Sequence, residues 1–198
     1  HDALPICIHN AGRGLWMDWM AQGTRISGNL LYDNTTDDLY VEVDHGPFLV
    51  DNNLLLSEIS LRDVSQGGAY AHNLMTGKID CQSALNRFTP YHHAHSTALA
   101  GVSNFKGGDD RFYNNLFVGS GDPPGPEQKR PGKSSVRVAG FGLWVYDGRD
   151  FPLETGGNVY YRGARPYAGE DGPRLVADID PQPEILNPGI VDPVVQSV

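Results

Sequence analysis

Two similar stretches decide how this chain folds: "GLWMDWMAQGTRISGNLLYDN" (Gly14–Asn34) and "LYVEVDHGPFLVDNNLLLSE" (Leu39–Glu58). Each begins with a short run in which apolar residues alternate with others, and each ends in an asparagine followed by apolar residues. Each also carries one carboxylate inside the apolar run, Asp18 in the first stretch and Glu42 in the second. Two such stretches in succession indicate a repeating unit built from strands.

The asparagine that closes each stretch recurs along the chain. The phrase of asparagine and apolar residues appears five times, with steps of 24, 20, 42 and 43 residues between the asparagines. Few windows have helical periodicity, and glycine and proline are frequent. The pattern predicts an all-β fold, a parallel β-helix of several coils with an asparagine ladder at one corner. Each double-length step predicts an additional coil or a long loop. The asparagines are Asn29, Asn53, Asn73, Asn115 and Asn158.

Three other segments complete the expected organisation. The stretch Arg87–Tyr113 is rich in aromatic residues and histidine, and predicts a long ordered loop inserted over the coils. Gly119–Ser135 is polar and rich in Pro and Gly, and predicts an exposed excursion. Residues 1–180 are expected to form the β-helix domain. Residues 181–198, with four prolines, are expected to form an extended tail or linker toward a region outside this chain.

Composition excludes some partners. The chain has 198 residues with 15 basic and 24 acidic side chains, and the formal charge of −9 argues against nucleic acid or an anionic membrane. No apolar run approaches the roughly 20 residues of a membrane span. The opening residues lack the basic and apolar regions of a signal peptide, so the sequence indicates a mature chain or a piece of a longer protein. Cys7 and Cys81 predict two free, buried thiols in preference to a disulfide bridge.

The two carboxylates occupy equivalent positions in the repeat. Asp18 and Glu42 each lie 11 residues before the closing asparagine of their stretch. Strand alternation directs both outward, with Asp44 outward and Trp19 inward on the same grounds. Adjacent parallel strands lie about 4.7–4.9 Å apart. Carboxyl groups about 5–5.5 Å apart are typical of retaining glycosidases, whereas inverting enzymes need about 6.5–9.5 Å. The spacing therefore favours a retaining over an inverting mechanism. The large apolar neighbours and the regularity of these two repeats favour a nucleophile and acid/base pair over two solvated surface carboxylates.

Three nearby residues are candidates for binding substrate. Counting 11 residues before the third asparagine gives Arg62, which is expected to face outward under Glu42. Arg62 would hold Glu42 in place, bind a sugar hydroxyl or form a surface ion pair. Trp16 is expected to stack on a sugar ring or to pack under the inserted loop. His45 is expected to hydrogen-bond a substrate hydroxyl or to serve the turn in which it lies.

The segment "HHAH" raises the question of a metal site. It lacks the helical spacing or paired cysteines of a strong zinc site, so His92 and His95 are expected to contribute to a lid or a sugar subsite. Asp109 and Asp110 provide too few ligands for a defined calcium site. The expectation is therefore that the protein uses no metal and no cofactor.

Several of these motifs, in order, resemble the β-helix core of the glycoside hydrolase family 120 β-xylosidases. The motifs span roughly residues 14–163: "GLWMDWMAQGTRISGNLLYDN", "DLYVEVDHGPFLVDNNLLLS", "SQGGAYAHNL", "RFTPYHHAHST" and "KGGDDRFYNNLFV". The resemblance implies a right-handed parallel β-helix with an associated β-sandwich, and release of xylose from short xylo-oligosaccharides with retention. By matching motif, it implies Asp18 as the nucleophile and Glu42 as the acid/base. Members of that family are much longer than 198 residues.

Other functions remain open from the residues alone. A β-helical polysaccharide lyase or an inverting polysaccharide hydrolase would use the same architecture, although the acidic charge and the single Arg62 argue against both. A carbohydrate-binding scaffold without catalysis is the third alternative. An oligosaccharide substrate is the expected partner, together with a second copy of the chain or another part of the same protein.

Overall fold

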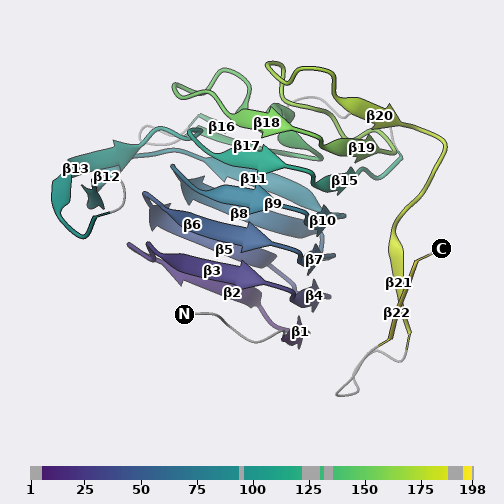
Figure 1. The fold of residues 1–198 in the computed structure, drawn as a ribbon. Coiled ribbons are helices and arrows are strands. Elements are labelled where there is room, and N and C mark those ends of the chain that lie inside the picture. The colour runs from purple at the N-terminus through teal and green to yellow at the C-terminus, as the bar shows by residue number, and fades with distance from the viewer. Residues whose placement is uncertain (1–5, 94–95, 122–129, 132–135, 187–193, 198) are drawn as a thin grey trace.

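The computed structural model describes residues 6–93, 96–121, 130–131, 136–186 and 194–197. Most strands belong to three stacked sheets, and from β1 to β12 each strand along the chain lies in a different sheet from the strand before it (Figure 1). The described residues contain one short helical element, the 3₁₀-helix η1 (Leu143–Tyr146). Within the described part of the chain, no helix has the length and apolar character needed to cross a membrane.

The first sheet has seven strands in the order β1 (Cys7–His9), β4 (Leu30–Tyr32), β7 (Leu54–Leu55), β10 (Leu74–Met75), β15 (Leu116–Val118), β19 (Val159–Tyr161) and β20 (Arg174–Val176). The second has six, in the order β16 (Arg130–Pro131), β17 (Val136–Gly140), β11 (Lys78–Gln82), β8 (Ile59–Ser65), β5 (Asp37–Asp44) and β2 (Arg13–Asp18). The third has five, in the order β18 (Glu154–Gly156), β14 (Arg111–Tyr113), β9 (Ala69–Ala71), β6 (Phe48–Asp51) and β3 (Thr24–Ser27).

The expected fold class, a right-handed parallel β-helix, is wrong as a description of this structure. The strands form separate sheets of mostly parallel strands with almost no helix, and they do not follow one uninterrupted parallel winding. In the six-stranded sheet, β17 pairs with β11 in the antiparallel direction, and β16 pairs with β17 in the same way. The physical reason lies in the double-length steps, where hairpins and antiparallel strands take the place of a further parallel repeat.

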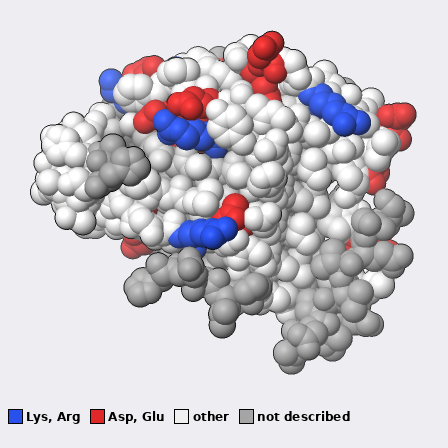
Figure 2. Space-filling model, viewed as in Figure 1, with Lys and Arg blue, Asp and Glu red and all other residues white. Residues whose placement is uncertain are grey.

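The inserted segment is one of these hairpins. Strands β12 (Ala84–His92) and β13 (Leu99–Phe105) pair antiparallel and project from the stack, where a long loop was expected (Figure 1). The projecting end is mainly uncharged (Figure 2). The described part of the C-terminal tail also forms an antiparallel hairpin, from β21 (Pro183–Leu186) and β22 (Val194–Ser197). The division of the chain at residue 180 stays a prediction.

Apolar residues of equivalent strands stack on one another to form the core. In the seven-stranded sheet, Leu31 pairs with Leu55, Leu55 with Met75, Met75 with Phe117 and Phe117 with Tyr160, and all five are almost fully buried. Each strand alone would expose its apolar side chain, so stacking removes a continuous apolar row from water. The short strands are therefore stabilised by their neighbours more than by their own length.

The asparagine ladder predicted from the sequence is confirmed. At each step, the side-chain oxygen of one asparagine accepts hydrogen bonds from the backbone and side-chain N–H groups of the asparagine before it, at 2.9–3.2 Å. The asparagines are buried, so these bonds satisfy polar groups that have no access to water. The ladder fixes the register of successive repeats.

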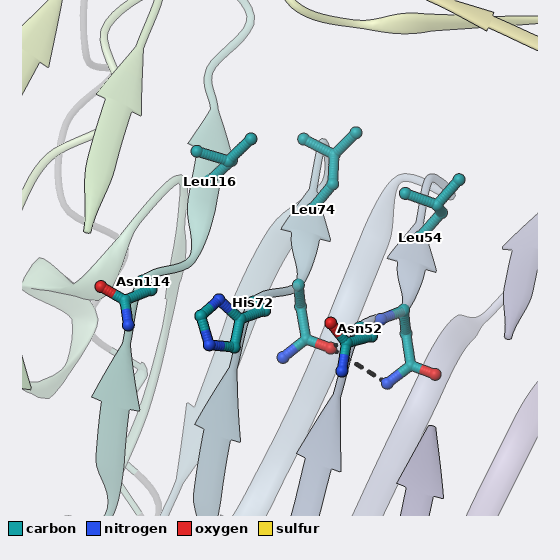
Figure 3. A pocket seen from close by; sticks show the side chains of 8 residues that line it. Asn52, Leu54, His72, Leu74, Asn114 and Leu116 are labelled. Carbon is teal, nitrogen blue, oxygen red and sulfur yellow. Dashed lines mark hydrogen bonds between the residues drawn. The ribbon is translucent and has the colours of Figure 1, made fainter. Parts of the chain in front are cut away.

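The backbone conformation of the residue before each ladder asparagine explains why that residue is glycine, asparagine or histidine. Gly28, Asn52, His72, Asn114 and Gly157 all have a positive φ, between 56° and 73°. Glycine adopts this left-handed conformation at little cost, and asparagine and histidine adopt it more readily than most residues. Figure 3 shows three of these side chains lining a shallow pocket on the outside of the ladder, beside Leu54, Leu74 and Leu116.

Both cysteines are free, as predicted. Cys81 is buried but Cys7 is exposed, so the expectation of burial is correct for Cys81 alone. Cys7 is exposed because it begins β1, the first strand at one edge of the seven-stranded sheet.

Candidate functional site

The two candidate carboxylates lie directly opposite one another on neighbouring strands. Strands β2 and β5 pair in parallel, and the register runs from Arg13 opposite Asp37 to Asp18 opposite Glu42. This is the register that the repeat predicts. Asp18 ends β2 and is exposed, whereas the side chain of Glu42 is 19% exposed. The pairing places the backbones of the two residues about one strand spacing apart, roughly 4.8 Å.

Each carboxylate is followed by a residue with unusual backbone geometry. Trp19 has a φ of 25° and Val43 a φ of 47°. Left-handed backbone is uncommon for bulky and β-branched residues and costs about 1–3 kcal/mol. The cost falls at the same repeat position on both strands, immediately after the candidate residue. Strained backbone conformations are common at functional sites, so their position beside Asp18 and Glu42 supports this pair as the candidate site.

The geometry at Val43 and Trp19 also corrects two expected side-chain directions. The register of β5 against β8 shifts between Glu42 and Asp44, so Asp44 turns inward and is fully buried, where an outward direction was expected. Trp19 lies beyond the end of β2 and is exposed, where an inward direction was expected. Both errors arise because simple alternation holds only while the strand remains regular.

Glu42 has a defined set of neighbours. The Trp16 Nε1–H group donates a hydrogen bond to Glu42 Oε2 at 3.0 Å, and Arg87 Nη1 lies 3.8 Å from Glu42 Oε1. The Tyr40 hydroxyl interacts with Glu42, and burial, followed by the Glu42 charge, raises the pKa of Tyr40 to about 12. Two donors and a guanidinium therefore surround this carboxylate.

Sequence reasoning did not identify Arg87 or Tyr40 as site residues. Arg87 lies 45 positions after Glu42 and is brought beside it by the base of the β12–β13 hairpin, where residues 85–88 form a bulge. No periodic pattern in the sequence indicates that contact. Tyr40 could have been found, because it lies two residues before Glu42 on the same face of a predicted strand.

Arg62 does not lie under Glu42 as expected. It pairs in register with Tyr40, whereas Val64 is opposite Glu42. The error came from counting back from Asn73, because this repeat is four residues shorter than the previous one. The Arg62 Nε atom lies 3.3 Å from Asp37 Oδ2 and 3.4 Å from Asp80 Oδ2, within ion-pair range but without hydrogen-bond geometry.

Arg62 belongs to a row of alternating charges that crosses five strands. Arg13 contacts Asp37, and Arg137 contacts Asp80, with Arg62 between the two carboxylates. Neither aspartate side chain is exposed to solvent, so each depends on its arginines for compensation. Arg62 therefore stabilises the sheet by compensating the charges of Asp37 and Asp80.

Arg62→Ala is expected to lower the free energy of unfolding by about 3 kcal/mol, which is at the low end for breaking a buried ion pair because each aspartate keeps a second arginine. Urea denaturation followed by circular dichroism measures the change. Lys78→Ala is the matched control, because Lys78 pairs with the exposed Glu58 and should contribute less than about 1 kcal/mol. Equal effects of the two substitutions would contradict the structural role of Arg62.

The three histidines that were expected to contact the substrate do not lie together beside Asp18 and Glu42. His45 Nε2 lies 3.1 Å from the Ser103 carbonyl, its ring stacks on Phe105 at 4.2 Å, and burial lowers its pKa. A neutral His45 therefore packs against the base of the hairpin. His92 lies at the outer end of β12, opposite Leu99, and no contact joins it to Asp18 or Glu42. His95 lies outside the described residues.

No three His, Cys, Asp or Glu side chains gather as a possible metal site among the residues that the structure describes. Among the aspartates that the structure does bury, Asp44 lies two residues after Glu42. Asp44, Asp63 and Asp110 are all buried, and burial is the largest cause that raises the pKa of each. The charge of Asp63 also raises the pKa values of Asp44 and Asp110. For Asp44 the pKa is raised to about 6.

Asp44→Asn is expected to stabilise the protein at pH 7 by about 1–3 kcal/mol. The folded protein holds a proton on Asp44 up to about pH 6, whereas the unfolded chain releases it near pH 4. The free energy of unfolding therefore falls as pH rises from 4 through 6, and removing the charge prevents that loss. Asp44 Oδ1 accepts a bond from the Gly46 N–H group and Oδ2 has no partner, so an amide fits.

Asp38→Asn provides the matched comparison. Burial also raises the pKa of Asp38 to about 6, but both of its oxygens accept hydrogen bonds, from Asn34 and from the side chain and backbone of Ser57. The NH2 group of an asparagine there would face one of these donors, so we expect Asp38→Asn to destabilise the protein. Thermal unfolding from pH 4 to 8 measures both. A loss of stability in Asp44→Asn at pH 7 would contradict the prediction.

Comparisons with known proteins gave one informative match. No family model matches the chain, and a search of curated proteins found no match. A solved structure is similar, with a TM-score of 0.71 and 39% sequence identity over 92% of this chain. That structure is XylC in complex with xylose. The chain spans 30% of the length of XylC.

The match to XylC supports the sequence resemblance in its coarser form. At this identity and coverage, the chain shares the fold of part of a protein whose structure holds xylose. Membership of glycoside hydrolase family 120, the catalytic roles and the oligomeric state stay predictions.

Proposed function

We propose that this chain carries the catalytic pair of a retaining glycoside hydrolase that releases xylose from short β-xylo-oligosaccharides. The observation that supports the proposal most is the register that sets Asp18 opposite Glu42 on adjacent parallel strands. A separation of roughly one strand spacing suits the 5–5.5 Å of retaining enzymes, because it leaves no room for a water between nucleophile and acid. The relation to XylC, solved with xylose, supports a pentose as the sugar.

The roles follow from the surroundings of each carboxylate. Asp18 is exposed and free to approach the anomeric carbon, so it attacks C1 while the bond to the leaving oxygen breaks. Glu42 gives its proton to that oxygen, and a xylosyl-enzyme ester forms on Asp18. In the second step Glu42 takes a proton from water, the water oxygen bonds to C1, and Asp18 leaves as the carboxylate. Two inversions give net retention.

The substrate contacts expected from the sequence differ in how they fit this proposal. Trp16 is 53% exposed beside Glu42 and is placed to contact a sugar. Arg62 and His45 are occupied by Asp37, Asp80 and the hairpin, and His92 lies away from the pair along β12. We therefore propose that further contacts come from parts of the protein equivalent to the remainder of XylC.

The test is the stereochemistry of the first product. The full protein is incubated with xylobiose, and the anomeric proton of the released xylose is followed by NMR before mutarotation. Retention predicts that β-xylose appears first. Initial α-xylose would indicate an inverting hydrolase, and an unsaturated product would indicate a lyase. Binding of xylobiose without any cleavage would indicate a carbohydrate-binding module, and each of these three outcomes would overturn the proposal.

A further inference from the structure

The two oxygens of the Glu42 carboxylate lie in different surroundings. Oε2 accepts the hydrogen bond from Trp16 Nε1 at 3.0 Å. Oε1 faces Arg87 Nη1 at 3.8 Å, a distance too long for a hydrogen bond. The indole therefore donates a hydrogen bond to Oε2, whereas the contact of Arg87 with Oε1 is a longer ion pair.

The chemistry of the indole ring makes this difference important. Indole Nε1–H is a donor only and has no lone pair to accept a proton. The oxygen that faces it must therefore accept, and in a neutral carboxyl group the carbonyl oxygen is the stronger acceptor. When Glu42 is protonated, the bond from Trp16 thus favours Oε2 as the carbonyl oxygen and Oε1 as the oxygen that carries the proton. The Tyr40 hydroxyl can donate or accept, so it does not oppose this assignment.

The indole ring is held in place although half of it is exposed. It stacks on the Tyr40 ring, with centroids 5.7 Å apart and planes inclined by 24°. The Arg13 guanidinium lies 5.2 Å from the Trp16 ring and 4.4 Å from the Tyr40 ring, and Asp37 anchors it at 3.0 Å. Stacking and cation–π contacts thus fix the direction in which the N–H group points.

We propose that Trp16 is a positioning residue that makes Oε1 of Glu42 the proton-bearing oxygen of the acid/base. This inference rests on the proposed function for its catalytic consequence. In the first step, Oε1 gives its proton to the leaving oxygen as the C1–O bond breaks. In the second step, Oε1 takes a proton from the attacking water. Trp16 keeps Oε2 bonded throughout, so the carboxyl group does not rotate between the steps.

Trp16→Phe tests the proposal, because phenylalanine keeps an aromatic ring but lacks the N–H group. For xylobiose, whose leaving group needs protonation, kcat is expected to fall about 10- to 100-fold, part of the full contribution of a general acid. For 2,4-dinitrophenyl β-xyloside, which leaves without help, the first step is expected to change less than about threefold. A residue that serves only as a sugar platform would raise KM similarly for both substrates, and that result would overturn the inference.

Trp144→Phe is the control for loss of an indole elsewhere. Trp144 lies in η1 and stacks with Arg165, so this variant should keep the wild-type ratio of the two rates. A changed ratio in Trp144→Phe would show that the measurement does not report on the site, and would overturn the inference.

A second measurement does not depend on turnover. The Trp16 indole N–H resonance is expected to move with pH as Glu42 ionises, and to lose that dependence in Glu42→Gln. A resonance that ignores Glu42 would overturn the positioning role even if xylobiose is cleaved with retention. Conversely, a resonance that follows Glu42 in a protein that cleaves no xyloside would leave the hydrogen bond intact and overturn the proposed function, and with it the catalytic role of Trp16.

Discussion

Asp18→Asn is expected to reduce kcat on xylobiose by on the order of 10⁴-fold, because the amide has the shape of the carboxylate but cannot form the glycosyl ester. Asp18 is exposed at the end of β2, and no hydrogen bond to another described residue depends on its charge. The fold should therefore survive, and the melting temperature should change little. Steady-state kinetics and thermal unfolding on the same preparation separate the two effects.

The covalent intermediate provides an independent check on Asp18. A 2-deoxy-2-fluoro-xyloside with a good leaving group should accumulate as an ester, and mass spectrometry of peptides should place the label on Asp18. Asp33→Asn is the control, since Asp33 is an exposed aspartate in the turn after β4. Near-normal turnover in Asp18→Asn, or a label on another residue, would refute the assignment.

Glu42→Ala is expected to affect substrates according to their leaving group. Cleavage of xylobiose should fall about 10²- to 10⁴-fold, because the departing alkoxide then receives no proton. The first step with 2,4-dinitrophenyl β-xyloside should be nearly unchanged, and hydrolysis of the xylosyl-enzyme should become slow. Azide should restore turnover and yield β-xylosyl azide, because a small anion can enter the space left by Glu42 and needs no base.

Glu58→Ala is the control for loss of a glutamate. Glu58 is exposed, pairs with Lys78 and lies outside the candidate site, so its removal should leave both substrates unaffected. Equal losses on both substrates in Glu42→Ala, without azide rescue, would indicate that Glu42 supports the structure and does not transfer a proton.

Much of the repeat could be predicted from sequence. The asparagine spacing correctly predicted the ladder, and the equal distance from Asp18 and Glu42 to their asparagines correctly predicted their register. The register prediction worked because Asp18 and Glu42 are 24 residues apart, as are Asn29 and Asn53, so equal positions in the two stretches lie opposite one another. The same counting failed for Arg62, where the repeat shortens to 20 residues.

The fold as a whole was less predictable. The double-length steps were compatible with several structures, and the antiparallel pairing of β17 with β11 was not indicated by any local pattern. The β12–β13 hairpin was not predicted from the sequence, because Pro90 and the bulge at residues 85–88 interrupt the alternation of apolar and polar residues on which strand prediction depends. These features result from pairing between distant segments, which periodicity alone does not encode.

The sequence by itself determined the ladder, the stacked apolar rows and the placing of two carboxylates on adjacent strands. Local repetition suffices for these, because each recurrence of the motif brings the same position onto the next strand of the sheet. Only the tertiary structure decided what surrounds Glu42: Arg87 arrives from the hairpin, Trp16 turns its N–H group toward Oε2, and Val43 turns Asp44 inward. The physical reason is that these contacts depend on a bulge, a stacked ring and a distant segment, each of which is fixed only when the sheets have assembled.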